Sequence, residues 1–278
     1  MELQAERVLE ELNNRLPLTF ALDRELSGSF RLGLNNPDLI FQFNLLPRSP
    51  ADEKPLQTWR QQQEELAAQN KTLIHIWEDQ WTRRREAVLS RIAAVAGVCQ
   101  TIHGRETTVK RIEAPVAARF LAEHHLLVPL KGKYRFGLVH GNELVSLAVF
   151  SGGRKMAGRP ASYRSFELLR FCHRGMYLVQ GGLSKLLAAF HAAFRPSDVM
   201  TYVDLDWSEG HAFRQLGFIP SGTRPPQEFW INPREQLRHY PGRLPLPLER
   251  SSPEALHQAD YYSIHNCGSL KLIKKYKE

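Results

Sequence analysis

The order of local patterns between residues 134 and 190 constrains the fold of this chain more than any other feature. The run YRFGLVHGNELVSLAVF consists of two apolar segments joined by HGNE, residues 140–143, which is typical of a β-hairpin. Another strand is expected at YRSFELLRFCH, and VQGGLSKLLAAF, residues 179–190, then places two glycines before an alanine- and leucine-rich helix. Strands that alternate with helices in this way predict an α/β domain.

A separate α/β pattern precedes this one. The first 16 residues predict an amphipathic helix, and FRLGLNNPDLIFQFNLL predicts a hairpin that turns at NNPD. A loop at 46–55, a polar helix, the short strand KTLIHIW and a single helix over 78–97 are expected to follow. Because the pattern restarts near residue 98, we expect a small α/β domain at 1–97 and a second domain at 98–278.

Basic residues are unevenly distributed along the chain, whose 278 residues carry a formal net charge of +8. Residues 1–97 contain 12 Lys and Arg against 14 Asp and Glu, whereas residues 98–278 contain 25 against 15. The second part is therefore expected to present a basic surface. Its partner would be a nucleic acid, an acidic membrane or a polyphosphate cofactor, or the surface is simply solvated.

The cysteines and the apolar runs of the sequence indicate the cellular compartment in which the protein is expected. Cys99, Cys172 and Cys267 stand far apart and follow no zinc-binding spacing, so reduced thiols are expected. No apolar run approaches the roughly 20 residues that cross a bilayer, and the N-terminus is unlike a signal peptide. We expect a soluble, cytoplasmic protein that has no membrane partner.

The segment 179–185 is a candidate anion site. Unpaired N–H groups at a helix start attract anions, and glycine allows a diphosphate to approach the backbone closely. The spacing matches neither GxGxxG nor a Walker loop, so neither of those phosphate sites is expected. A tight turn without a ligand is the alternative interpretation. The candidate residues are Val179, Gln180, Gly181, Gly182, Leu183, Ser184 and Lys185.

The succession of hairpin, strand, glycine turn, helix, the strand DVMTYVDLDW and the helix SEGHAFRQLGF resembles the GNAT superfamily of acyl-CoA-dependent N-acyltransferases. The resemblance covers about residues 105–235 and implies a mixed sheet with flanking helices. In that family the turn after the fourth strand binds the CoA pyrophosphate through backbone amides, so 179–185 would bind acetyl-CoA or another acyl-CoA. Phe213 stands where the family often has a tyrosine that protonates the CoA thiolate.

A closer resemblance is to the GNAT-like module found beside phage homing-type endonucleases. It rests on FELLRF (166–171), QGGLSKL (180–186) and TYVDLDWSEG (201–210). A fainter resemblance to Mom-type phage DNA-modification proteins implies a nucleic-acid base as acceptor. The basic, aromatic C-terminal part, with Trp230, Tyr240 and the lysines after residue 270, is expected either to contact DNA or RNA or to be a solvated face.

The N-terminal part resembles a nuclease of the very-short-patch-repair type, with LIHIWEDQW and VLSRI similar to its last strand and helix. In that family, carboxylates in a hairpin and in a Glu-Phe-Asn motif bind magnesium. Here Arg31 stands near the aspartate position, and Gln42-Phe43-Asn44 replaces the motif. None of these four residues supplies an anionic ligand, so we expect a degenerate domain with no metal and no nuclease activity.

Candidate catalytic residues lie on several expected elements. Glu167 and Arg170 would position the substrate or form a buried ion pair. Asp204 and Asp206 share one face of a strand and would act as a general base, one raised in pKa by the other, unless Asp206 caps the next helix. His125, with its neighbour at 124, would be a base at the acceptor pocket or a solvated helix end.

These observations predict a GNAT-like N-acyltransferase, or a related group-transfer enzyme, that acts on a nucleic acid or another anionic acceptor. The alternative is a non-enzymatic nucleic-acid-binding protein derived from a mobile-element endonuclease.

Overall fold

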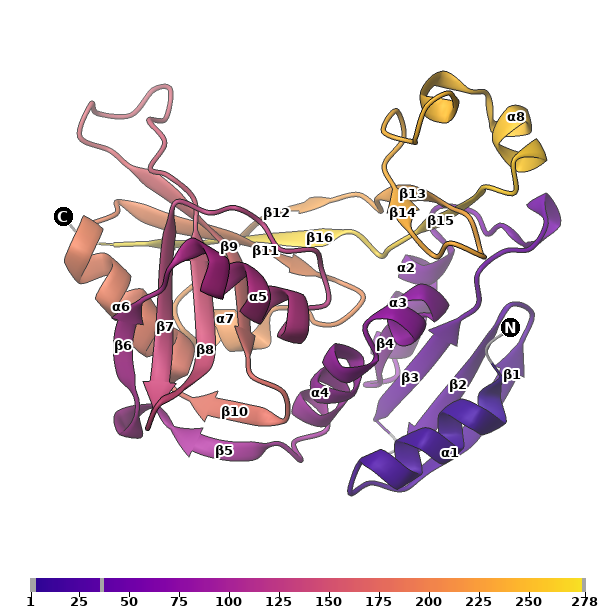
Figure 1. Cartoon of the computed structure of the whole chain (residues 1–278), viewed down its shortest axis with the longest axis horizontal. Coiled ribbons are helices and arrows are strands. Elements are labelled where there is room, and N and C mark those ends of the chain that lie inside the picture. Colours follow the sequence, from indigo (N-terminus) through magenta and orange to yellow (C-terminus); the bar gives the residue numbers. More distant parts are fainter. Residues whose placement is uncertain (1–3, 36–37, 277–278) are drawn as a thin grey trace. The chain divides into compact units, whose positions relative to one another are not determined.

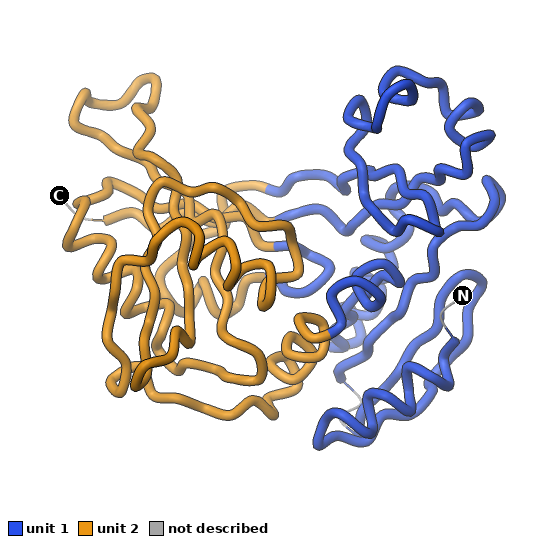
Figure 2. Tube along the Cα trace, viewed as in Figure 1, with its two compact units in different colours: residues 1–85, 204–209, 223–269 blue, residues 86–203, 210–222, 270–278 orange. Residues whose placement is uncertain are grey.

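The chain packs into two compact units in a computed structural model, which describes residues 4–35 and 38–276 (Figure 2). Unit 1 comprises Met1–Arg85, Asp204–Glu209 and Thr223–Ser269, and unit 2 comprises Glu86–Val203, Gly210–Gly222 and Leu270–Glu278. The sequence had suggested one boundary at residue 97. The observed units instead divide near residue 85, and two later segments pack with the N-terminal part.

Unit 1 is built on a four-stranded sheet of order β1-β2-β3-β4. Its strands are β1 (Phe20–Leu26), β2 (Ser29–Leu34), β3 (Leu39–Asn44) and β4 (Thr72–Trp77). β2 and β3 form the predicted antiparallel hairpin, although part of its NNPD turn lies outside the described residues. β3 and β4 are parallel, and helix α2 (Thr58–Ala67) provides the crossover between them.

The remaining helices of the N-terminal part follow the sequence expectation with one exception. Helix α1 (Ala5–Arg15) buries Val8 and Leu12, as its amphipathic pattern predicts. The single helix expected over 78–97 is instead two helices, α3 (Glu78–Arg83) and α4 (Arg85–Val95). The break falls at Arg84, whose backbone is non-helical (φ −131°, ψ 32°).

The late segment of unit 1 adds a small antiparallel sheet of order β14-β13-β15. It contains β13 (Glu228–Ile231), β14 (Arg238–His239) and β15 (Tyr262–His265), with helix α8 (Pro253–Gln258) between β14 and β15. Trp230, Leu244, Leu256 and Tyr261 form its apolar core.

Unit 2 contains a seven-stranded mixed sheet of order β12-β16-β11-β9-β8-β7-β6 (Figure 1). The pairs from β6 to β9 are antiparallel, whereas β11 runs parallel to β9. The strands, in chain order, are β6 (Thr108–Arg111), β7 (Tyr134–His140), β8 (Glu143–Phe150), β9 (Ser165–His173), β11 (Asp198–Asp204), β12 (Ile219–Arg224) and β16 (Ser269–Lys275). β5 (Gln100–His103) and β10 (Tyr177–Gln180) form a separate parallel pair.

Helices cover both faces of this sheet, because consecutive residues of the central strand β8, from Val145 to Phe150, are buried. On one face, α6 (Gly182–Phe194) places the Phe190 ring 3.9 Å from that of Phe150, stacked at 12°. On the other face, α5 (Ala114–His124) packs Phe120 and Leu121 against β8 residues, including Leu147. The predicted α/β class and the mixed sheet with flanking helices are confirmed. Helix α7 (His211–Gln215) follows β11.

Among residues 4–35 and 38–276, no helix is both long and apolar enough to cross a lipid bilayer.

Candidate functional site

The glycine turn connects a strand to a helix, as its sequence predicts. β10 ends at Gln180, Gly181 adopts a left-handed conformation with φ +72°, and α6 begins at Gly182. A residue with a side chain would be strained at Gly181, so glycine is needed to turn the chain directly into the helix.

The first turn of α6 contains backbone donors that the helix itself does not use, although Gly182 and Leu183 are buried. Lys185 N donates to Gly181 O at 3.0 Å, which leaves the N–H groups of Gly182, Leu183 and Ser184 ahead of the helical hydrogen-bond ladder. Gly181 and Ser184 are exposed, and the turn contains no acidic residue. Donors and the helix dipole therefore favour an anion here, so a diphosphate fits this part of the chain.

Other residues of the segment support the turn instead of facing solvent. Val179 and Leu183 are buried in the core of unit 2. A side chain on Gly182 would place its Cβ 3.1 Å from atoms of Leu138 and Val179, which is tighter than ordinary contact. The Lys185 ammonium donates to Gly104 O at 2.9 Å and Thr107 O at 2.5 Å, so it anchors the turn before β6.

β9, which precedes β10 and α6, and β11, which follows α6, are paired over only a short distance. β9 and β11 align from Ser165↔Asp198 to Glu167↔Met200, and the Thr201 hydroxyl then donates to Leu168 O at 3.0 Å. The register of β8 and β9 shifts between Phe150↔Leu168 and Val149↔Arg170, so Leu169 is an extra residue in β9. Beyond this bulge β9 continues to His173 with β8 as its partner.

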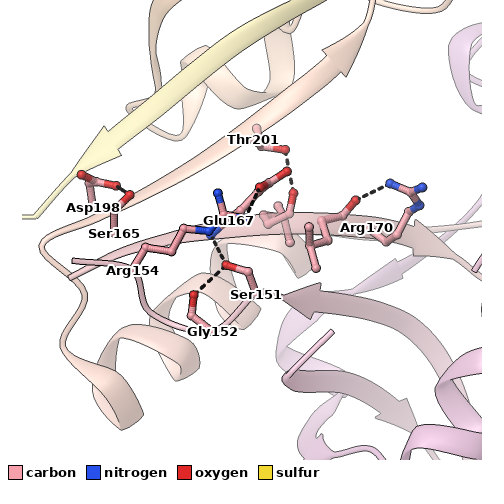
Figure 3. A network of polar contacts seen from close by, with 10 residues as sticks. Ser151, Gly152, Arg154, Ser165, Glu167, Arg170, Asp198 and Thr201 are labelled. Atoms are coloured by element: carbon pink, nitrogen blue, oxygen red, sulfur yellow. Dashed lines mark hydrogen bonds and ion pairs between the residues drawn. The ribbon is translucent and has the colours of Figure 1, made fainter. Parts of the chain in front are cut away.

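Glu167 and Arg170 lie on either side of this bulge (Figure 3). The Glu167 carboxylate is 3.5 Å from the Arg154 guanidinium in the loop after β8. The backbone N–H of Glu167 donates to the Ser151 hydroxyl. Arg170 donates to Leu169 O at 2.7 Å and to Val128 O at 3.4 Å. Glu167 thus connects β9 to the loop at 151–162, and Arg170 connects it to the chain after α5.

His125 lines a hollow of about 130 Å³ at the far end of β9. The hollow lies where α4, the end of α5 and the end of β9 meet, and its walls include His124, Cys172, His173 and Tyr177. Tyr177 begins β10, so this hollow and the glycine turn lie at opposite ends of a four-residue strand, about 13 Å long at the usual rise per residue.

The histidines of this hollow differ in what they can do. Burial lowers the pKa of His124, and it lowers the pKa of His173 to about 4, so both rings are neutral near pH 7. His125 Nδ1 accepts from Leu127 N at 3.0 Å, so in its neutral form the ring carries its proton on Nε2. His173 Nδ1 is 2.6 Å from the Ser146 hydroxyl, which is fully buried and fixes the orientation of the ring. Sequence patterns gave no indication of this Ser–His pair on neighbouring strands.

Asp204 and Asp206 belong to unit 1, whereas the other candidate residues belong to unit 2. Asp206 is 1% exposed, and its carboxylate accepts from Cys267 N at 2.7 Å. Burial and the charge of Asp204 raise the pKa of Asp206 to about 8. β11 ends at Asp204, so the two aspartates do not share a strand as the sequence predicts. Because its backbone carbonyl also accepts from His75 N, Asp206 connects three segments of unit 1 and does not reach solvent. Asp204 is only half-buried, and its Oδ1 accepts from Asp206 N.

A buried ion pair that the sequence did not reveal lies in the same unit. Arg238 donates to both oxygens of Asp79, at 2.7 and 2.8 Å, across 159 positions of sequence. Both side chains are largely buried, and the positive charge of Arg238 also acts on Asp206.

Arg31, Gln42 and Asn44, the residues that the sequence analysis compared with a nuclease motif, form a ladder of hydrogen bonds between one cationic and several neutral side chains. Arg31 Nε donates to Gln42 Oε1 at 2.8 Å, and Gln42 Nε2 donates to Asn44 Oδ1 at 2.9 Å and to Gln62 Oε1 at 3.1 Å. Asn44 in turn contacts His75 Nδ1 at 3.2 Å. Amides and a guanidinium do not provide the anionic oxygens that magnesium prefers, so the donor set does not fit a catalytic magnesium ion. Among the described residues, no cluster of three His, Cys, Asp or Glu could hold a metal.

Comparison with known proteins finds similarity at the level of structure. No protein-family model and no curated protein sequence matches the chain. Solved acetyltransferases align with it. A GNAT family acetyltransferase from Elizabethkingia anophelis with acetyl-CoA bound has 14% identity, covers 62% of this chain and 99% of its own, and gives a TM-score of 0.38. The ribosomal-protein-S18-alanine N-acetyltransferase from Escherichia coli has 12% identity, covers 62% of this chain and 95% of its own, and gives a TM-score of 0.38. A structure described as histone acetyltransferase HPA2 and related acetyltransferase, from Corynebacterium glutamicum, has 14% identity, covers 62% of this chain and 98% of its own, and gives a TM-score of 0.36.

Proposed function

We propose that the chain is an acyl-CoA-dependent N-acyltransferase of the GNAT type, and that unit 2 binds the cofactor. The observation that carries this proposal is the start of α6, where a left-handed and exposed Gly181 leads directly into an acid-free first turn in which Ser184 is exposed. The turn occurs in the order of hairpin, strand, turn and helix that resembles the family. Ser184 and the backbone N–H groups of Gly182 and Leu183 would hold the diphosphate.

The acceptor pocket in this proposal is the hollow at the end of β9. When bound, the acyl-CoA supplies an activated acyl group, and the chain must supply a base for the amine that receives it. His124 is suited to this role, because burial keeps its ring neutral and able to take a proton near pH 7. Ser146 would act as a positioning residue through His173. In this proposal Asp206 has a structural role, since it does not reach solvent.

Charge supports an anionic acceptor. Unit 2 contains 21 Lys and Arg against 8 Asp and Glu, a net charge of +13, whereas unit 1 contains 16 against 21, a net charge of −5. The net charge of +8 for the whole chain therefore understates the positive charge of unit 2. A nucleic acid is the acceptor we propose, because phosphate contacts by Lys and Arg provide much of its affinity.

The first test of the proposal is a charge reversal in the α6 turn. Ser184→Asp should weaken acetyl-CoA binding by tenfold or more, because a carboxylate near a diphosphate costs at least ~1.4 kcal/mol at the effective dielectric of a protein surface. An aspartate in a first helical turn stabilises the helix, so the variant should fold. Ser184→Asn is the neutral control and should bind within about threefold of the wild type. Equal affinities for all three proteins in titration calorimetry would refute this cofactor site.

Acceptor binding has its own prediction. Lys131, Lys133 and Lys155 are exposed, and Lys133 lies close to Gly152 in the loop after β8. If they bind phosphates, replacing all three by glutamine should reduce the slope of log affinity against log salt by about 0.9 for each lysine–phosphate pair that the substitutions remove. Fluorescence anisotropy with a short duplex, at several salt concentrations, measures this slope. An affinity that does not change with salt would contradict a nucleic-acid acceptor.

For unit 1 we propose a nuclease-derived domain without nuclease activity. The support is the ladder of Arg31, Gln42 and Asn44, which occupies the positions of the metal-binding motif with residues unsuited to magnesium. The relationship to phage homing-type endonucleases belongs to this proposal as well.

A further inference from the structure

A row of polar side chains crosses one face of the four-stranded sheet of unit 1. Arg24 of β1 lies opposite Arg31 of β2. Arg31 in turn lies opposite Gln42 of β3, which lies opposite His75 of β4. Side chains at directly opposite strand positions point to the same face of a sheet. The inner end of the row, at Gln42 and His75, is fully buried, whereas the outer end consists of two arginines, one half-buried and one exposed.

The two arginines at the outer end line a hollow of about 500 Å³. Its lining comes from β1, β2, β3, α2 and the chain after α2, all within unit 1. The charged lining residues are three cations, Arg24, Arg31 and Lys71, and two carboxylates, Asp23 and Glu65. A hollow of this volume lies within the range of about 300–1,000 Å³ that small-molecule sites occupy.

The carboxylates of the lining do not compensate the two arginines. Burial and the charge of Arg24 lower the pKa of Arg31, whereas Asp23 and Glu65 act in the opposite direction with a smaller effect. The next ionisable side chain of the row, His75, is neutral, because burial and the charge of Arg31 lower its pKa to about 3. Like charges at directly opposite strand positions destabilise a sheet, so an anion between the two guanidinium groups would remove an unfavourable interaction.

The cations of the hollow are available to such an anion. Among residues 4–35 and 38–276, no carboxylate forms an ion pair with Arg24, Arg31 or Lys71. Guanidinium groups bind phosphate through two parallel hydrogen bonds, and a lysine ammonium binds it as a point charge. A phosphate monoester carries a charge of about −1.5 to −2 near pH 7, so one such group would balance most of the positive charge of the three cations.

We propose that this hollow binds the phosphate group of a small phosphate monoester, held by Arg24, Arg31 and Lys71. The volume leaves room for an organic group beside the phosphate. A small ligand is favoured over a nucleic-acid strand, because unit 1 contains 16 Lys and Arg against 21 Asp and Glu and therefore repels a long polyanion. This site is independent of the acyl-CoA proposal, because all of its lining residues belong to unit 1.

The test measures the stability of unit 1 in the full-length protein, with glucose 6-phosphate as the probe. All five tryptophans belong to unit 1, so their fluorescence during urea denaturation reports on this unit. A ligand that binds only the folded state raises the urea midpoint as its concentration increases. We expect a rise with glucose 6-phosphate at constant ionic strength, and no rise with glucose, which lacks the phosphate.

Three variants assign the effect to the hollow. Arg24→Gln should weaken glucose 6-phosphate binding by tenfold or more, as expected for the loss of a charge-assisted hydrogen bond. Asp23→Asn should strengthen it by about threefold, because it removes a negative charge near the phosphate. Both side chains are exposed, so both variants should fold. Arg234→Gln is the matched control: Arg234 is exposed, lies in the same unit and does not line the hollow, so its affinity should be that of the wild type.

The proposal would be overturned by equal effects of glucose 6-phosphate and glucose on the wild type, or by equal affinities of the wild type and Arg24→Gln. Weaker binding by Asp23→Asn would also contradict it, and that variant keeps the test valid if Arg24→Gln fails to fold. A short oligonucleotide without a terminal phosphate is the last probe. If it binds unit 1 more tightly than glucose 6-phosphate, the ligand is a phosphodiester strand and the assignment to a small monoester is wrong.

Discussion

Replacing Arg238 by methionine is expected to lower the free energy of unfolding of unit 1 by about 3–5 kcal/mol. The substitution keeps most of the side-chain volume but leaves the Asp79 carboxylate, which is 8% exposed, without its bidentate partner. It also removes the positive charge that acts on Asp206. Breaking a buried ion pair from one side costs more than the pair contributes, because the remaining charge stays desolvated.

Tryptophan fluorescence during urea denaturation measures this effect in unit 1 specifically, because all five tryptophans belong to that unit. The matched control is Arg234→Met: Arg234 is 87% exposed, and its ion pair with Asp260 is 3.7 Å long. Exposed pairs of this kind contribute little, so the control should stay within about 0.5 kcal/mol of the wild type. If Arg238→Met also unfolds within about 1 kcal/mol of the wild type, the assignment of this pair as a main stabilising contact of unit 1 is wrong.

The stability of unit 1 should be greatest near pH 6.5 and fall on both sides. Burial lowers the pKa of His75 to about 3 and that of His265 to about 4, from 6.5. Below pH 6.5 the unfolded chain therefore binds protons that the folded unit excludes, and stability falls with pH. Asp206 acts in the opposite direction, because burial and Asp204 raise its pKa from 3.8 to about 8. The folded unit keeps that proton while the unfolded chain has lost it, so stability falls as pH rises from 3.8 to 8.

Below pH 6.5 the two histidines outweigh the one carboxyl, and the net loss by pH 5 is about 1 kcal/mol. Between pH 6.5 and 8 the proton kept by folded Asp206 outweighs the protons that the unfolded histidines still bind, and the net loss is about 1 kcal/mol. Urea midpoints read by tryptophan fluorescence across this range provide the measurement. Asp206→Asn should abolish the decrease above pH 6.5 and keep the decrease below it. A wild-type stability that continues to rise to pH 8 would contradict the protonated, buried state of Asp206.

Elements with a strong local signal could be predicted from the sequence. The two hairpins, the amphipathic α1 and the turn from β10 into α6 each depend on residues adjacent in sequence, such as the HGNE turn and the glycine at position 181. A glycine that must adopt a positive φ, directly before an alanine- and leucine-rich run, restricts the chain to few conformations. Of these elements, the β7–β8 hairpin and the turn into α6 belong to unit 2, which contains the proposed cofactor site.

Long-range pairing could not be predicted in the same way. The packing of 204–209 and 223–269 with the N-terminal part depends on contacts such as Asp79–Arg238 and Asp206–Cys267, whose partners are far apart in sequence. No periodicity or turn signal records such pairs, so the composition change near residue 98 suggested a simpler division. The Leu169 bulge is similar, because only its pairing with β8 reveals it.

The roles of individual polar residues were the least predictable. Lys185 was a candidate phosphate ligand by its place in the motif, yet its ammonium is bound by two carbonyl oxygens before β6. Asp206 had the raised pKa expected of a catalytic carboxyl, but the burial that raises the pKa also removes it from solvent. Sequence identifies which groups are present, whereas their accessibility depends on the tertiary packing.

The most direct test of the central claim is thermal unfolding of the wild-type protein with and without acetyl-CoA. A ligand that binds only the folded state must stabilise it, by about 2.7 kcal/mol at a concentration 100 times its dissociation constant. The account predicts a clear rise in the midpoint, retained in Ser184→Asn and lost in Ser184→Asp. No rise at saturating acetyl-CoA, or an equal rise in Ser184→Asp, would contradict a cofactor site at the start of α6.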